Sequence, residues 1–145
     1  MKKKKSKQIK LGDIYAIPLP NGKFAFGRRL KDASIAIYDH IGDSIEALPK
    51  EEDYQFTVGV YDDVLKSGNW PFVENRPYLD ENEAWPPPAC IIDRISGEYS
   101  IYHLGEIRTS DRKECEGLEM AAAWDAHHIV DRIMGDDMWH RDPYR

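Results

Sequence analysis

Apolar positions in the first third of the chain recur with the period of two that is typical of β-strands. From Ile14 to Leu19 both sets of alternate positions are apolar, so both faces of this strand are expected to pack. Asn21-Gly22 follows and is a strong hairpin-turn signal, because both residues accept a positive φ. The return strand is predicted from Lys23 to Leu30, and a third strand from Ser34 to Asp39. Short strands joined by tight turns indicate a meander that bends into a small barrel or a curved sheet.

The middle of the chain continues the β pattern and adds one short helical turn. Residues 54–61 (YQFTVGVY) are rich in β-branched and aromatic side chains, which predicts a strand with a bulge at Gly59. Asp62 or Asp63 is a suitable cap for a helical turn that runs through Lys66. The chain therefore changes from strand to helix directly after residue 61.

Residues 69–88 combine aromatic residues and prolines and are too apolar for a free linker. We expect this loop to pack over the sheet. Two short β-rich runs follow, at 89–94 and 99–104, with a Ser-Gly-Glu turn between them. They predict a second hairpin.

The last third of the chain predicts one long helix over residues 117–134, ended by Gly135. Trp124 lies nearly opposite the apolar stripe of this helix. It is therefore either covered by a neighbour, such as the 69–88 loop, or exposed as an anchor for a partner. The residues on the core-facing stripe are Leu118, Ala122, Ala126, Ile129, Val130 and Ile133.

Together these elements predict an α+β fold. We expect a bent antiparallel sheet or a partly open small β-barrel of about five to seven short strands, with one packed C-terminal helix. A chain of 145 residues is expected to form one domain. Residues 1–10 are expected to be a flexible basic tail, and residues 11–145 a single domain.

Charge divides the chain into a basic start and an acidic body. The first ten residues contain six lysines and no acid, so with a net charge of −6 for the whole chain, residues 11–145 carry −12. An acidic body favours a basic partner and makes nucleic acid an unlikely one. No apolar run reaches the length of a membrane-spanning helix, and the lysines are not followed by the apolar region of a secretory signal. We therefore expect a cytoplasmic protein without a membrane partner.

The residues suited to chemistry form no recognisable catalytic pattern. His127 and His128 are adjacent, so on a regular helix they diverge by about 100° and do not both face one metal ion. Cys90 and Cys115 have no zinc-like spacing and are expected to be buried, structural thiols. We expect no cofactor, no metal and no catalysis. A metal-dependent hydrolase that uses one of the two histidines stays an alternative, as does a small barrel that binds nucleic acid through its lysine tail and Arg28-Arg29.

Carboxylates beside aromatic residues suggest two surfaces for a basic protein partner. One is the outer face of the predicted helix together with the acidic segment after it, and the other is the loop at 69–88. The candidate partner-binding residues are Trp124, His128, Asp131, Asp136, Asp137 and Trp139 on the first surface, and Asp80, Glu81 and Trp85 on the second.

The stretch KLGDIYAIPLPNGKFAFGRRL resembles the start of the immunity protein 26 family of bacterial polymorphic-toxin systems. The Pro-rich segment, the second hairpin and the Gly117-Leu118-Glu119 helix start follow in a compatible order, whereas the four-lysine start is not part of the pattern. The matching residues are Lys10, Gly12, Asp13, Tyr15, Pro18, Pro20, Gly22, Phe24, Phe26, Gly27 and Arg28.

This resemblance implies a cytoplasmic protein that binds and neutralises a cognate toxin without catalytic residues of its own. Many such toxins are nucleases with basic, phosphate-binding clefts, which an acidic inhibitor can occlude. The implied function is therefore consistent with the acidic body and with the lack of a catalytic pattern.

Overall fold

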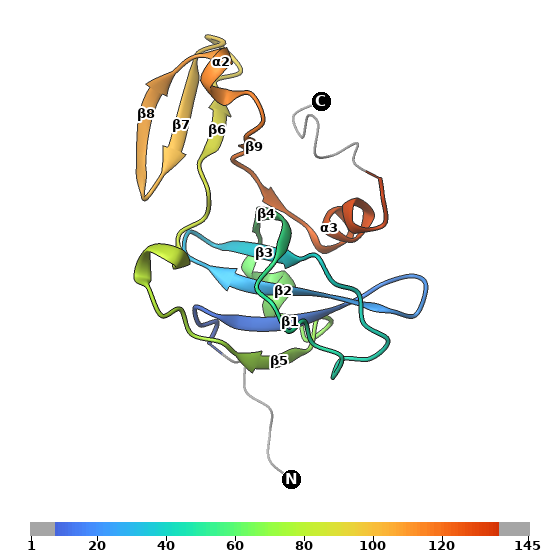
Figure 1. Cartoon of the computed structure of the whole chain (residues 1–145). Coiled ribbons are helices and arrows are strands. Elements are labelled where there is room, and N and C mark those ends of the chain that lie inside the picture. Colours follow the sequence, from blue (N-terminus) through green and yellow to red (C-terminus); the bar gives the residue numbers. More distant parts are fainter. Residues whose placement is uncertain (1–7, 137–145) are drawn as a thin grey trace.

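The computed structural model describes residues 8–136 and has an α+β fold with two open, mixed sheets (Figure 1). The large sheet has the order β10-β4-β3-β2-β1-β5, and the small sheet has the order β8-β7-β6-β9. The large sheet consists of β1 (Asp13–Pro18), β2 (Phe24–Leu30), β3 (Ser34–Tyr38), β4 (Tyr54–Val60), β5 (Phe72–Asn75) and β10 (Ala123–Trp124). The small sheet consists of β6 (Ala89–Ile92), β7 (Tyr99–His103), β8 (Glu106–Ser110) and β9 (Glu119–Met120). The helices are α1 (Asp62–Lys66), the 3-10 helix η1 (Glu81–Ala84), α2 (Arg112–Cys115) and α3 (Ala126–Ile133).

The predicted N-terminal meander is confirmed. β1 pairs with β2 from Ile14 opposite Arg28 to Pro18 opposite Phe24, and β2 pairs with β3. Gly22 has φ +83°, as the turn requires. The domain also extends before residue 11: Ile9 packs against the core, and the Lys10 amide donates to the Asp13 carboxylate at 2.9 Å. Residues 1–7 of the predicted tail lie outside the described residues.

Both faces of the large sheet are covered, as the doubly apolar pattern of β1 predicts. On one face Tyr15 and Ile17 contribute to the main core, which also contains Ile37 and Trp70. On the other face Ile14, Ala16, Phe26 and Tyr38 form a second cluster beneath the β3–β4 connection. The meander thus stands between two apolar layers.

Within the 69–88 segment, Phe72–Asn75 extend the large sheet as β5. β5 pairs with β1 at the sheet edge, while Trp70 is only 3% exposed and enters the main core. This strand, together with β8, β9 and β10, raises the number of strands in the described residues above the predicted five to seven. The predicted second hairpin is confirmed as β6 and β7.

The prediction of one long C-terminal helix over residues 117–134 is wrong. Glu119–Met120 and Ala123–Trp124 form two short strands, and the helical part is α3 alone. The helix ends before Gly135, which has φ +104°. β9 pairs in parallel with β6, and β10 pairs in parallel with β4. The alanine-rich sequence favours a helix, but pairing with two existing strands overrides that propensity. Trp124 is consequently 4% exposed within the main core.

Gly59 explains how β10 can lie against β4. A Cβ atom at this position would lie 2.6 Å from the Ala122 carbonyl oxygen. The irregularity in the β3–β4 pairing falls between Ile37 and Tyr38, so the predicted bulge at Gly59 is wrong. Because Gly59 has no side chain, the backbone at Ala122 can lie close to β4.

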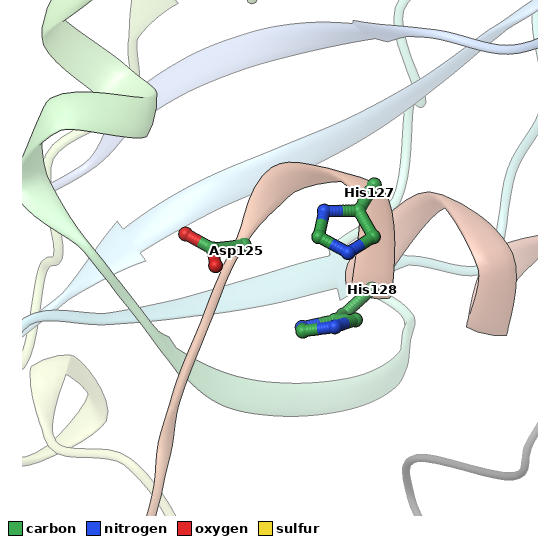
Figure 2. Close-up of side chains that lie close together, drawn as sticks. All are labelled: Asp125, His127 and His128. Atoms are coloured by element: carbon green, nitrogen blue, oxygen red, sulfur yellow. The ribbon is translucent and has the colours of Figure 1, made fainter.

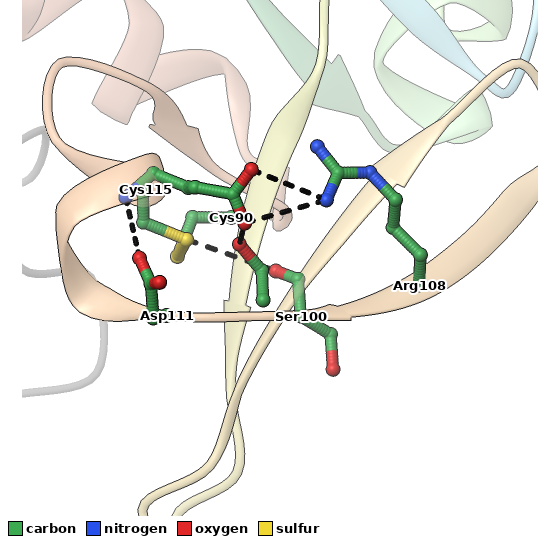
Figure 3. The surroundings of a disulfide bond; sticks show 7 residues. Cys90, Ser100, Arg108, Asp111 and Cys115 are labelled. Atoms are coloured by element: carbon green, nitrogen blue, oxygen red, sulfur yellow. Dashed lines mark hydrogen bonds and ion pairs between the residues drawn. A yellow bond between two sulfur atoms is a disulfide. The ribbon is translucent and has the colours of Figure 1, made fainter.

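In the small sheet, Cys90 and Cys115 are joined in a disulfide bond (Figure 3). Both residues are buried, as expected, but they are not thiols. Asp111 caps α2 by accepting from the Glu114 amide at 2.8 Å, and this turn brings Cys115 over β6, with the two Cα atoms 5.5 Å apart. Ile101 is the third buried residue of this small core.

Arg28 links the hairpin to the segments around it. Its side chain is buried; its Nε donates to the Arg76 carbonyl at 3.1 Å, and its Nη2 donates to the Pro77 carbonyl at 3.1 Å. Nη1 donates to the Tyr54 hydroxyl at 3.1 Å, and the guanidinium lies 3.8 Å over the Tyr78 ring. The Gly-Arg at the end of the hairpin is therefore a structural clamp.

Candidate functional site

The carboxyl ends of β4 and β10 meet at one edge of the large sheet, because these two strands run parallel. The amide of Tyr61, just after β4, donates to the Trp124 carbonyl at the end of β10 at 3.3 Å. α1 therefore begins beside α3. Tyr61 is 50% exposed, and the first helical residues are Asp62 and Asp63 on one side and Ala126 on the other. Neither aspartate caps α1 by a side-chain hydrogen bond, in contrast to the prediction.

Three side chains with metal-ligating atoms gather at the start of α3 (Figure 2). Asp125, His127 and His128 each place one ligand atom within 4.8 Å of the others, and the two imidazole centroids are 3.9 Å apart. Asp125 and His127 are exposed, and His128 is half-buried. The two adjacent histidines thus lie closer together than the 100° spacing of a regular helix suggests. We call these three residues the histidine cluster.

Side-chain contacts hold α3 in place beneath this cluster. The Trp124 ring meets the His128 ring edge-on, with centroids 6.4 Å apart. Arg132 lies 3.9 Å over the Phe56 ring and donates to both carboxylate oxygens of Glu119, at 2.9 and 2.7 Å. The second contact ties α3 to β9, so α3 is attached to both sheets.

The predicted partner-binding residues at the C-terminal end divide by burial. Trp124 presents no surface to a partner, because its ring is in the core. His128 and Asp131 are half-buried on α3, and the exposed Asp136 donates its amide to the Asp131 carbonyl at 2.9 Å. Asp137 and Trp139 lie outside the described residues.

The second predicted group gathers around η1. Asp80 accepts from the Asn82 amide at 2.9 Å and so starts the turn. Lys31 donates to Glu81 at 2.8 Å, and its ammonium lies 4.5 Å over the Trp85 ring. The hydrogen bond from Lys31, and then its positive charge, lower the pKa of the Glu81 carboxyl. Asp80 and Glu81 are exposed, and Trp85 is half-buried.

The two predicted groups do not form one surface. In Figure 1 the yellow-green η1 segment lies on the left of the large sheet, whereas α3 lies on the right. A single compact partner domain would have to span the width of the sheet to touch both groups.

A cavity between the two sheets had no signal in the sequence. Its volume is about 300 Å³, and its wall includes Gly59 from the large sheet and the Pro86–Pro88 segment. Tyr102 also lines it, and a hydrogen bond to Asp32 raises the pKa of that tyrosine. The cavity depends on how the sheets meet, which no local sequence pattern encodes.

Comparison with known proteins identifies one family. The model of immunity protein 26 matches residues 10–101, which span β1 to the middle of β7. The chain finds no match among curated proteins or among solved structures. Within the described residues, no helix has the length and apolar character needed to cross a membrane.

Proposed function

Because the chain belongs to the immunity protein 26 family, we propose that it binds a toxin protein and neutralises it by covering a functional surface, without catalysis. The observation that carries this proposal is the family match over residues 10–101. That span contains five strands of the large sheet and the Arg28 clamp. An inhibitor that acts by occlusion needs a rigid surface, and the doubly packed meander supports one.

The proposed partner is basic, and a nuclease toxin domain fits this description. Residues 11–145 carry a net charge of −12, which speeds encounter with a positively charged cleft. We propose two alternative contact surfaces. The α3 surface contains His128, Asp131 and Asp136, and the η1 surface contains Asp80, Glu81 and Trp85.

The proposed location is the cytoplasm of the cell that makes the toxin, where an immunity protein has to act. The Cys90–Cys115 disulfide does not favour this location, because disulfides are uncommon in a reducing compartment. The location therefore rests on the role of the family. Thiol labelling of the protein in intact cells would show whether Cys90 and Cys115 are bonded there.

A rescue experiment tests the function directly. The reading frame next to this gene is expressed as its C-terminal domain in a sensitive bacterium, with and without this protein. We expect toxicity that co-expression relieves, and a complex that co-purifies. A toxic neighbour that this protein neither binds nor relieves would contradict the proposal for that pair.

Charge reversals locate the contact surface. Asp131→Lys with Asp136→Lys changes the α3 surface, and Glu81→Lys with Glu83→Lys changes the η1 surface. Glu98→Lys with Glu106→Lys is the control, since both residues are exposed on the small sheet and the charge change is equal. We expect one test pair to weaken toxin binding by about tenfold or more and to reduce its salt dependence. Equal toxin affinity in all three variants would contradict both proposed contact surfaces, but it would not contradict neutralisation of the toxin.

A further inference from the structure

We propose that the histidine cluster, Asp125, His127 and His128, binds a divalent transition-metal ion of the late first row, such as Zn²⁺ or Ni²⁺. Its three ligand atoms already lie within 4.8 Å of one another. Two ligands at about 2.1 Å from a metal lie at most about 4.2 Å apart. Small rotations of the exposed Asp125 and His127 side chains close the remaining gap.

The boundary between strand and helix creates this convergence. Asp125 has φ −81° and ψ 162°, so its backbone is extended, and helical geometry begins only at Ala126. The carboxylate of Asp125 therefore does not follow the helical screw. The imidazoles of His127 and His128 come from the first turn of α3, with their centroids 3.9 Å apart. A residue outside the helix supplies the third ligand that a regular helix would not offer.

The ligand types select the class of ion. Two imidazoles and one carboxylate suit zinc, nickel, copper and iron, whereas magnesium and calcium prefer oxygen ligands alone. Three protein ligands leave at least one coordination position for water or for a donor from another molecule. This position faces solvent, because two of the three ligands are exposed.

The surrounding charges favour a cation on balance. Asp62 and Asp63 begin α1 beside the start of α3, and Asp125 itself is anionic. Arg29 pairs with Asp62 at 3.3 Å, and Arg132 is engaged with Glu119. The positive end of the α3 dipole opposes cation binding but is a partial charge, which the Asp125 carboxylate offsets.

The site lies in a part of the chain that the family match does not reach. All three residues follow residue 101, where the match with immunity protein 26 ends. His128 also belongs to the proposed α3 contact surface, so metal binding is tested through Asp125 and His127, which are not among the proposed toxin contacts.

Calorimetric titration of the tag-free full chain with Zn²⁺ and with Ni²⁺ tests the site. We expect one ion per chain, and affinity at least about tenfold lower in His127→Gln and in Asp125→Asn, since loss of even a supporting partner of a metal ligand costs this much. These two residues are exposed, so the variants keep the packing of α3. His103→Gln, on the small sheet, is the matched control and should bind as the parent does.

Fluorescence gives a second measurement that a merely structural role of the histidines would not change. The Trp124 ring lies 6.4 Å from the His128 ring, so Cu²⁺ bound at the cluster should quench Trp124 emission. Quenching should saturate at one equivalent, and His127→Gln should need at least about tenfold more Cu²⁺ for the same quenching. Absence of binding by the parent chain, unchanged affinity in both ligand variants, or an equal loss in His103→Gln would overturn the proposal.

Discussion

The two sheets of this protein are stabilised in different ways. The large sheet is packed on both faces, with Ile14, Ile17, Ile35 and Ile37 completely buried. The small sheet has three buried residues in its core, and two of them are the halves of the disulfide. Its outer strand β8 is almost entirely exposed. The large sheet therefore depends on apolar burial, and the small sheet depends on a covalent bond that compensates for a thin core.

This difference separates the meander, which is the scaffold of the fold, from the small sheet and α3, which are added to it. The continuous apolar layers come from the meander, which is also the part with the clearest sequence pattern. α3 packs Ile129 into the main core, and the Arg132–Glu119 pair joins α3 to β9 of the small sheet. Perturbations of the two regions should therefore differ in size and in how far they spread.

The same truncation in each core should give the largest contrast. Ile37→Ala removes a fully buried side chain from the main core, and we expect it to lower the free energy of unfolding by about 4 kcal/mol. Ile101→Ala in the small core should cost about 2 kcal/mol, because fewer packed neighbours surround it. Urea denaturation of both variants measures the difference. Equal losses would show that the small core is as tightly packed as the large one.

Removal of the disulfide should act almost entirely on the small sheet. Cys90→Ser with Cys115→Ser opens a loop with a sequence separation of 25, for which chain entropy predicts a loss of about 3.5 kcal/mol. Hydrogen exchange should speed up for the amides of β6 and β7, while the amides of β2 and β3 stay protected. Reductant added to the parent chain should reproduce this pattern and leave the serine variant unchanged. Uniform loss of protection would mean that the two sheets unfold together.

Alkaline pH should weaken the large sheet through its buried tyrosines. Burial raises the pKa of Tyr15 to about 12, and burial together with a hydrogen bond to Glu52 raises the pKa of Tyr38. These hydroxyls stay protonated in the fold after they would ionise in the unfolded chain, near pH 10. Their contribution is therefore complete below pH 10 and is lost progressively above it, for Tyr15 up to about pH 12. Denaturation followed with tyrosinate absorbance checks this, and Tyr15→Phe should flatten the pH dependence.

The smallest expected effect comes from a helix cap in the small sheet. Asp111→Ala removes the acceptor for the Glu114 amide, which should cost about 1 kcal/mol. Asp111→Asn retains a capping oxygen and should restore most of the loss. Thermal unfolding compares the two variants. If alanine and asparagine behaved alike, the cap would not contribute to the position of Cys115.

The accuracy of the sequence-based prediction follows the same division. The meander and the β6–β7 hairpin were predictable, because β-rich runs flank a turn residue such as Gly22 close by in sequence. α1 was predictable in its position, although neither Asp62 nor Asp63 caps it as expected. β9 and β10 were not, since their alanine-rich sequence favours a helix and only pairing with the distant β6 and β4 makes them strands. The disulfide had no signal because its cysteines are brought together by tertiary folding.

The candidate sites show the same limit. The exposed acids of η1 and α3 were identified from composition alone, and their role in partner binding stays a prediction. The burial of Trp124 and the convergence of Asp125 with the two histidines follow from where α3 begins, at Ala126. The predicted helix started at residue 117, nine residues too early, so the predicted directions of the Trp124 and Asp125 side chains were wrong.

The parallel pairing of β10 with β4 has a consequence for synthesis on the ribosome. β1 to β5 leave the exit tunnel in order, and each of β2 to β4 can pair with the strand made just before it. β10 is translated after the whole small sheet, so until then β4 has a free edge in the nascent chain. The small sheet is thus inserted in the sequence between β5 and β10 of the large sheet. The large sheet is completed only when Trp124 emerges.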